Sequence, residues 1–499
     1  NSRTGVKLSY NKLKDKGYRE NDNYNRDGIT TLVSHQLTKD IDISYLGRYH
    51  ELKAFIPSSV SKETFQNNPS YAADNWKAVS GNETYSKLLN GLSLNVDLND
   101  QITTATSLFI KHYEGNEIRP FNILDDNSAT YGSRSRIQLD TRISDFEITT
   151  QAGFEYLYEI YKWNVYETLE MGEQGTLLNK NNQKRHQQNF FGSFDIQWKN
   201  LTFSTGLNTN KTSYQYNDLF QDSIDLSDKK EFQWIVSPRF SLNYEILKNV
   251  MLFSTLSHGF STPSYEETLN AQGYVTGSIQ PEKGWNRELG IRINDTKHDL
   301  FVKISGYSIA VKNLLVTKRL AEDEFYKMNA GETLHNGIEM SLQGKWLDNE
   351  VLTSTVNTSY MFANYRFKEF TDRGNDFSGN ALPGIPRHKV FFQLDANFRA
   401  GLYLTTNLIW SDKMAMNDEN SKYSSSYKRV TIKAGFRKSL SERWGIHIYT
   451  GIRNLTNEHY ASMILINAPS FGGAPPRYYY PAEPRNYYGG IAITYSMSK

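Results

Sequence analysis

The sequence predicts an all-β protein, a transmembrane antiparallel β-barrel of about 20 strands that occupies residues 1–499 as one domain. Three observations predict this fold. Apolar and polar residues alternate along the whole chain, the connections between strands alternate between short and long, and the composition is aromatic but otherwise polar.

The alternation is clearest in the last stretch, residues 485–499. One face of an extended strand there would be apolar with tyrosines near both ends, and the other small and polar. By itself such a strand also suits the edge of a soluble sandwich. Elsewhere, Asp195, Gln393 and Asp395 lie in mid-strand and need water or partners, which a wet lumen supplies. The apolar faces are therefore predicted to meet lipid, with tyrosines as interfacial anchors.

The connections fall into two sets. Tight turns are expected at residues 38–40, 99–100, 199–200 and 348–349, whereas residues 53–82 form a long connection. Each strand has roughly 10 residues, the length that a tilted strand needs to cross a bilayer. A barrel with short periplasmic turns and long extracellular loops has this arrangement. Glycines within strands, such as Gly435 and Gly451, are expected to let the sheet bend and a neighbour approach.

The composition excludes several classes of protein. Only 38% of the 499 residues are hydrophobic but 13% are aromatic, which suits aromatic girdles better than a large soluble core. No apolar run approaches the roughly 18 residues of a membrane helix. The absence of cysteine excludes disulfides, thiolate metal sites and a cysteine nucleophile. A net charge of +2 without a clustered basic face gives no sign of a nucleic-acid partner.

The sequence contains no motif for catalysis or for a resident cofactor or metal. The ten histidines show no close ligand spacing, and neither a nucleophile elbow nor a phosphate loop is present. Residues 372–379 place oxygens at alternate positions but lack the closing Glu of a calcium loop. We therefore expect no enzyme and no cofactor, although Ser and His from neighbouring strands could still meet in the lumen.

Several short stretches resemble the barrel of TonB-dependent outer-membrane receptors. Seven occur in the family's order, and they cover nearly the whole chain: Gly17-Tyr18-Arg19-Glu20-Asn21, Ser237-Pro238-Arg239-Phe240 with Ser257-His258-Gly259-Phe260, Pro281-Glu282 with Glu288-Leu289-Gly290, Asn329-Ala330-Gly331 with His335-Asn336-Gly337, Leu382-Pro383-Gly384-Ile385-Pro386-Arg387-His388, Gly451-Ile452-Arg453-Asn454, and Pro484-Arg485-Asn486-Tyr487-Tyr488.

The resemblance implies a location in the outer membrane of a Gram-negative bacterium and a barrel of about 22 strands around an amino-terminal plug, preceded by a segment that binds TonB. The loop at Gly17 normally follows the third strand of the family. The chain is thus expected to lack the plug and the first two strands. It also ends in Met497-Ser498-Lys499 instead of the usual aromatic residue.

The function implied by the resemblance is active import of a ferric siderophore or similar iron complex, driven by TonB. Haem is a rival cargo: Phe260-Ser261-Thr262-Pro263 and Ile279-Gln280-Pro281-Glu282 depart from the family's haem motifs, but His258 keeps haem open. Cobalamin or another nutrient also remains open. Alternatives of another class are a passive outer-membrane pore and an outer-membrane enzyme.

Ferric siderophores are often anionic and aromatic, so the mouth should offer cations and ring faces. We expect ligand-binding residues in four loops, at residues 114–131, 179–186, 318–319 and 467–484. The alternative for each cation is a solvated loop or a contact to lipopolysaccharide phosphate. The candidates are Arg119, Lys184, Arg185, Arg319, Phe471, Arg477, Tyr478, Tyr479 and Tyr480.

Overall fold

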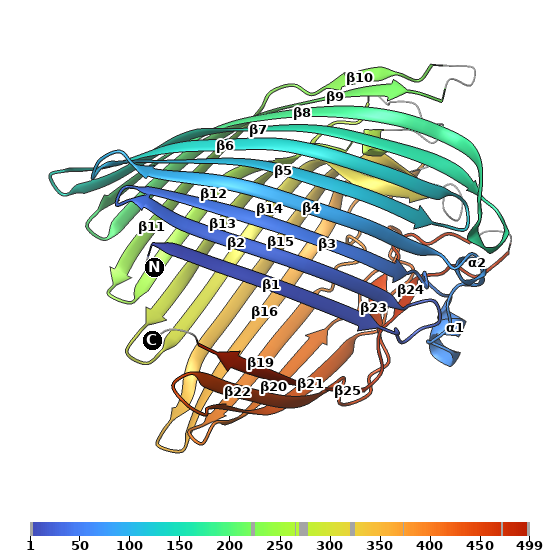
Figure 1. Ribbon diagram of the computed structural model, residues 1–499. Helices are drawn as coiled ribbons and strands as arrows, with labels where there is room; N and C mark the ends of the chain where they lie inside the picture. Colours follow the sequence, from blue (N-terminus) through green and yellow to red (C-terminus); the bar gives the residue numbers. More distant parts are fainter. Residues whose placement is uncertain are drawn as a thin grey trace.

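A single antiparallel sheet curls around a central lumen and forms the whole wall of the molecule (Figure 1). The computed structural model describes residues 3–220, 225–264, 266–268, 278–319, 325–372, 374–470 and 473–496. The sheet has 21 strands, of which the short β10 (Asp228–Glu231) pairs with the part of β9 that extends beyond β11. The predicted all-β barrel is thus confirmed.

Each wall strand pairs with its neighbours in chain order, from β1 round to β25. Two short pairs, β17–β18 (Thr371–Asp372, Asn375–Asp376) and β23–β24 (Ala461–Ile464, Tyr479–Pro481), lie in the loops. The other wall strands are β1 Thr4–Asp15, β2 Tyr24–Thr38, β3 Ile41–Phe55, β4 Asn82–Asp97, β5 Ile102–Ile118, β6 Ile123–Ile143, β7 Phe146–Thr168, β8 Gln174–Trp198, β9 Leu201–Asp218, β11 Ile235–Leu247, β12 Val250–Ser261, β13 Glu282–Asp295, β14 Leu300–Arg319, β15 Phe325–Asp348, β16 Leu352–Glu369, β19 His388–Phe398, β20 Leu402–Ser411, β21 Tyr427–Ser439, β22 Trp444–Arg453 and β25 Asn486–Tyr495.

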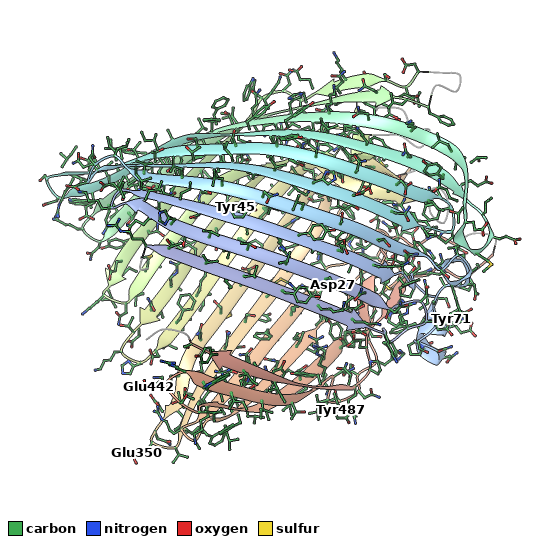
Figure 2. The ribbon with its side chains drawn as sticks, viewed as in Figure 1. Asp27, Tyr45, Tyr71, Glu350, Glu442 and Tyr487 are labelled. Atoms are coloured by element: carbon green, nitrogen blue, oxygen red, sulfur yellow. The ribbon has the colours of Figure 1, made fainter. Side chains whose placement is uncertain are left out.

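The outer face is apolar and much of the inner face is polar, as predicted. On β25, Tyr487, Ile491 and Ile493 are 71%, 69% and 67% exposed, and Tyr487 lies on the outer surface (Figure 2). Because side chains alternate, Tyr488 and Gly490 face the lumen. Among the mid-strand polar groups, Asp395 accepts a hydrogen bond of 2.6 Å from Thr405 of the paired strand.

Tight turns gather at one end of the barrel, and the longer connections lie at the other (Figure 1). In the turn between β15 and β16, the Asn349 side chain accepts hydrogen bonds of 2.9 Å from the backbone N–H groups of Val351 and Leu352. Such a side chain replaces the missing backbone partners of a turn. The predicted sorting of connections is therefore confirmed.

The strands on one side are longer than predicted. β8 has 25 residues and β15 has 24, so both continue well beyond the length needed to cross a bilayer. The predicted loops at residues 114–131, 179–186 and 318–319 consequently lie wholly or mostly within strands, which corrects the prediction. The reason is physical: outside lipid, a paired strand no longer needs an apolar outer face, so alternation ends while backbone pairing continues.

The opening between the first and last strands of the sheet is bridged at one end by loops from neighbouring strands. Within the described residues, no ladder pairs β1 with β25, and Figure 1 shows an opening between them. At the long-loop end, however, Val60 and Tyr479 exchange backbone hydrogen bonds of 2.8 and 3.2 Å. The β3–β4 connection, which carries the helices α1 (Lys62–Asn67) and α2 (Asp74–Ala78), thereby joins the β22–β25 connection. None of the described helices has both the length and the apolar character needed to span a membrane.

Candidate functional site: the mouth and the lumen wall

The segment from Arg477 to Tyr480 lies in a small core formed by loops. Tyr478 and Tyr479 are 6% and 7% exposed and pack with Val60 and other apolar side chains. The ring of Phe65 stacks on Tyr479, with 4.7 Å between the centroids. Burial raises the pKa of both phenols, so they remain neutral hydrogen-bonding groups. These two rings therefore hold the loops together and present little surface to a ligand.

Arg477 and Tyr480 are less buried than the tyrosine pair between them. The Arg477 guanidinium donates a hydrogen bond of 3.2 Å to the Oδ1 atom of Asn75 in α2. It thus links the β22–β25 connection to the β3–β4 connection. Phe471 and the side chain of Arg319 lie outside the described part of the chain.

Arg19, which was singled out only through the family resemblance, anchors this end of the barrel. It is 7% exposed and donates hydrogen bonds of 2.7 Å to the carbonyl of Ser58 and 2.8 Å to that of Tyr71. Burial lowers the pKa of its guanidinium, which nevertheless stays charged. Asn21 donates to the carbonyls of Ile56 and Gly81 at 2.9 and 3.0 Å. The Gly17–Asn21 stretch therefore shapes the β3–β4 connection.

Arg185 and Lys184 are neighbours in β8 but point to opposite faces. Lys184 shares the outward face of Phe190 and Phe194, whereas Arg185 faces the lumen. The Arg185 guanidinium lies over the ring of Tyr214, 5.7 Å from its centroid, and donates a hydrogen bond of 2.7 Å to Gln187. Tyr214 is only 3% exposed, so its ring supports the guanidinium, and Arg185 is the candidate that places a cation on the inner wall.

Arg119 lies among carboxylates. It pairs with Glu117 and lies 5.9 Å from the ring centroid of Phe121. Burial, followed by the nearby Glu117, raises the pKa of Glu83. Burial also raises the pKa of Asp126, which accepts a hydrogen bond of 2.8 Å from Tyr161. The charge of Arg119 is therefore partly balanced within the protein.

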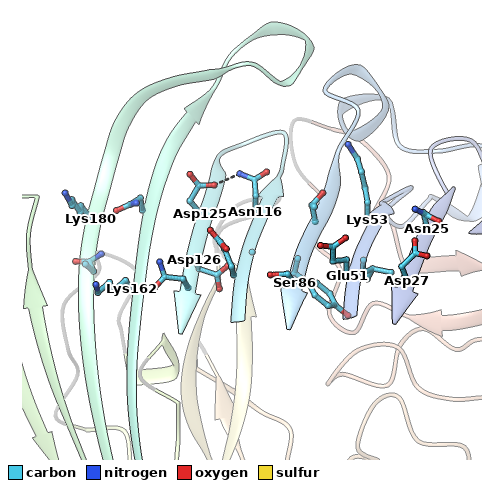
Figure 3. A pocket seen from close by; sticks show the side chains of 18 of the residues that line it. Asn25, Asp27, Glu51, Lys53, Ser86, Asn116, Asp125, Asp126, Lys162 and Lys180 are labelled. Carbon is cyan, nitrogen blue, oxygen red and sulfur yellow. Dashed lines mark hydrogen bonds between the residues drawn. The ribbon is translucent and has the colours of Figure 1, made fainter. Parts of the chain in front are cut away.

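A polar hollow of about 740 Å³ lies on the outside of the extended strands β2 to β8 (Figure 3). Glu51 and Lys162, which line it, share the outward faces of Tyr49 and Tyr158 respectively. Asn116 donates a hydrogen bond to Asp125 across it. The hollow faces away from the lumen and is not on a route through the barrel.

The binding cations predicted from the sequence all belong to expected loops, and cations on the inner wall were not predicted. Lys433, Arg437 and Arg453 lie on lumen-facing positions of β21 and β22. The alternation along each strand places these side chains on one face, but only the pairing of the strands brings them into one sector of the wall. Among the described residues, no group of three or more His, Asp or Glu side chains is placed to hold a metal ion.

Comparison with known proteins places the chain in a family. The family model "TonB dependent receptor-like, beta-barrel" matches residues 2–455. The ferric citrate transporter FecA, in its unliganded form, has a TM-score of 0.83 at 15% sequence identity, covering 99% of this chain and 74% of that one. The siderophore receptor PiuA from Acinetobacter baumannii gives 0.77 at 14% identity, with coverages of 98% and 77%.

The copper transporter OprC is about as similar in fold, with a TM-score of 0.77 at 15% sequence identity, covering 99% of this chain and 76% of that one. At such identities the structures show a shared fold, whereas the family model matches most of the sequence itself. The chain therefore belongs to the TonB-dependent receptors, a family of transporters and receptors, not enzymes, in the outer membrane of Gram-negative bacteria.

Proposed function

We propose that this protein imports an iron chelate, of the ferric siderophore type, across the outer membrane with energy supplied through TonB. The observation that carries the proposal is the lumen-facing guanidinium of Arg185 near the long-loop end, which lies over the buried ring of Tyr214. A guanidinium on the inner wall suits an anionic ligand, because it can donate charge-assisted hydrogen bonds to the ligand's oxygen atoms. Structures of the same fold include a ferric citrate transporter, a siderophore receptor and a ferric-catecholate import receptor, which supports the choice of iron.

Haem is less well supported than a siderophore. His258 lies directly opposite Trp285 in the register of β12 and β13. It shares a face of β12 with Leu252 and Leu256, which are exposed on the outer wall. This position directs the histidine away from cargo in the lumen. Copper is retained as a competing cargo because a copper transporter has a similar fold.

The intact receptor is also proposed to contain a plug and two further strands. Neighbouring strands alternate in direction round the whole sheet, so β1 and β25 run antiparallel to each other. An even number of added strands, such as two, can therefore close an antiparallel ring between them. Backbone groups on unpaired edges in lipid are costly, which supports such closure. The intact mass of the receptor isolated from outer membranes tests this proposal; a mass of 57.5 kDa, that of the present 499 residues, would contradict it.

Growth and uptake measurements test the proposed cargo. A deletion strain is grown with catecholate, hydroxamate or citrate iron chelates, haem or copper as the limiting metal source, and is complemented with each variant. We expect loss of growth on one iron chelate only. Arg185→Gln should raise the chelate concentration for half-maximal uptake about tenfold, since a charged contact of roughly 1.4 kcal/mol is lost.

Lys184→Gln is the matched control, because it removes the adjacent cation from the opposite face of the same strand. It should leave uptake unchanged. A strain that grows on every iron source but fails on copper, a vitamin or a glycan would overturn the iron assignment.

A further inference from the structure

One sector of the lumen wall has no acidic side chain. The inward positions of β20, β21, β22 and β25 are fixed by alternation from Tyr403, Gly435, Tyr449 and Gly490, which lie opposite one another in the pairing. Asp and Glu are absent from every inward position of these four strands. The same positions include the cations Lys433, Arg437 and Arg453.

These cations are held by aromatic rings instead of carboxylates. The Lys433 ammonium lies 4.1 Å from the ring centroid of Tyr449, and the Arg437 guanidinium lies 5.5 Å from that of Tyr403. The Arg453 guanidinium lies 5.0 Å from the centroid of Tyr488. A ring face attracts a cation without cancelling its charge. The lumenal cation stripe, defined as Lys433, Arg437 and Arg453, therefore keeps its positive charge.

Glycines on the paired strands leave room for the rings. Gly435 lies opposite Tyr403, and a Cβ atom there would come within 2.6 Å of the Tyr403 ring. Gly451 lies opposite Tyr488, whose ring a Cβ would approach to 2.4 Å. Each tyrosine thus lies across the glycine of its partner strand, close to the sheet, with one face available to the cation.

Another sector of the wall is arranged differently. On the inner faces of β13 and β14, Lys303 pairs with Glu288 at 3.2 Å and is thereby neutralised. No ion pair to a carboxylate joins any member of the lumenal cation stripe within the described chain. Arg437 and Arg453 are also exposed to the lumen. The wall itself therefore leaves the positive charge of this sector without a balancing carboxylate.

We propose that the lumenal cation stripe is a binding and guiding surface for an anionic, aromatic chelate on its way through the lumen. Lys433 and Arg437 are four residues apart on one strand, a rise of about 13 Å, so a ligand can leave one cation as it reaches the next. Tyrosine faces between them offer stacking to aromatic ligand groups. The identification of the cargo as an iron chelate rests on the proposed function. The negative charge of the cargo is inferred from the stripe itself.

Binding of two synthetic probes tests the stripe directly. The purified chain in detergent is dialysed against iron(III) tris(catecholate), a trianion, and against a neutral iron(III) tris(hydroxamate). The double variant Lys433→Gln/Arg437→Gln should weaken binding of the trianion at least about tenfold and abolish most of its salt dependence. Binding of the neutral chelate should not change.

Lys428→Gln/Lys438→Gln is the matched control, because it removes two cations from the outward face of the same strand. The proposal is wrong if wild type does not bind the trianion, if the stripe variant binds it with wild-type affinity, or if the control variant or the neutral chelate shows the same loss. These outcomes are separate from the growth assay. Trianion binding at the stripe together with normal growth on every iron source would reject iron as cargo and keep the anion-binding surface.

Discussion

Tyr403 shows how one residue takes part in both the wall and the lumen. Its ring occupies the space beside Gly435, its hydroxyl shares a hydrogen bond of 2.8 Å with His447, and the Arg437 guanidinium lies over its face. The glycine is therefore required for the position of the ring. The position of the ring in turn fixes the cation.

A methyl group at Gly435 should disturb this arrangement. We expect Gly435→Ala to lower the free energy of unfolding by about 1–2 kcal/mol, because the ring must leave its place. Urea unfolding of the purified chain, followed by tyrosine and tryptophan fluorescence, measures the change. Gly259→Ala is the control, since a Cβ at Gly259 would meet no atom within 4 Å. Equal effects of the two substitutions would show that the contact with Tyr403 is not the cause.

The sequence supported the general role of such glycines but not the particular contacts. It predicted that Gly435 and Gly451 would let a neighbour approach, and the structure shows tyrosine rings from the paired strands there. The identity of the neighbour depends on the register between strands. Register follows from the turns and from the whole sheet, so no local pattern could reveal it.

At the scale of elements, the β3–β4 connection is ordered by a short stretch that precedes it by about two strands. Residues 56–81 contribute Val60 and Phe65 to the loop core, and Arg19 and Asn21 donate hydrogen bonds to five of their backbone carbonyls. A buried guanidinium suits this task because its donors are arranged in a rigid fork. The local stability of the β3–β4 connection should therefore depend on Arg19 more than on any exposed ion pair.

Arg19→Lys tests this dependence. Lysine keeps the charge but cannot reach the same carbonyls with a planar fork, so we expect a loss of about 2 kcal/mol of local stability. Hydrogen exchange of residues 56–81 should then accelerate about thirtyfold. Glu20→Gln is the control from the same loop, because the exposed ion pair between Glu20 and Lys77 should contribute little. Unchanged exchange in Arg19→Lys would refute the anchoring role.

Alternation located most wall strands, because lipid imposes an apolar outer face on every second residue. It failed where β5 to β9 and β14 to β15 continue into water, and it assigned Lys184 and Arg185 to a loop, whereas Arg119 does lie in the connection between β5 and β6. The buried positions of Tyr478 and Tyr479 were equally hidden, since they arise from contacts with the distant Val60 and Phe65. Contacts between long loops leave no periodic signal in a sequence.

On the scale of the whole molecule, the sorting of connections into short and long sets was sufficient to predict a barrel with tight turns at one end and long loops at the other. The 21 strands of the sheet agree with the predicted number once the four-residue β10 is set aside. The functional surface was predicted at the mouth alone. The charged sector of β20 to β25 emerges only when four strands are placed side by side.

The hydrogen bonds between Val60 and Tyr479 join the β3–β4 connection to the β22–β25 connection at the long-loop rim. Since no ladder joins β1 to β25 among the described residues, mechanical tension across the wall would widen the opening between them at the tight-turn rim first, while the long-loop rim kept its circumference. The diameter of the entrance is thus set by hydrogen bonds and side-chain packing among the loops. Deformation of the strands within the membrane need not change that diameter.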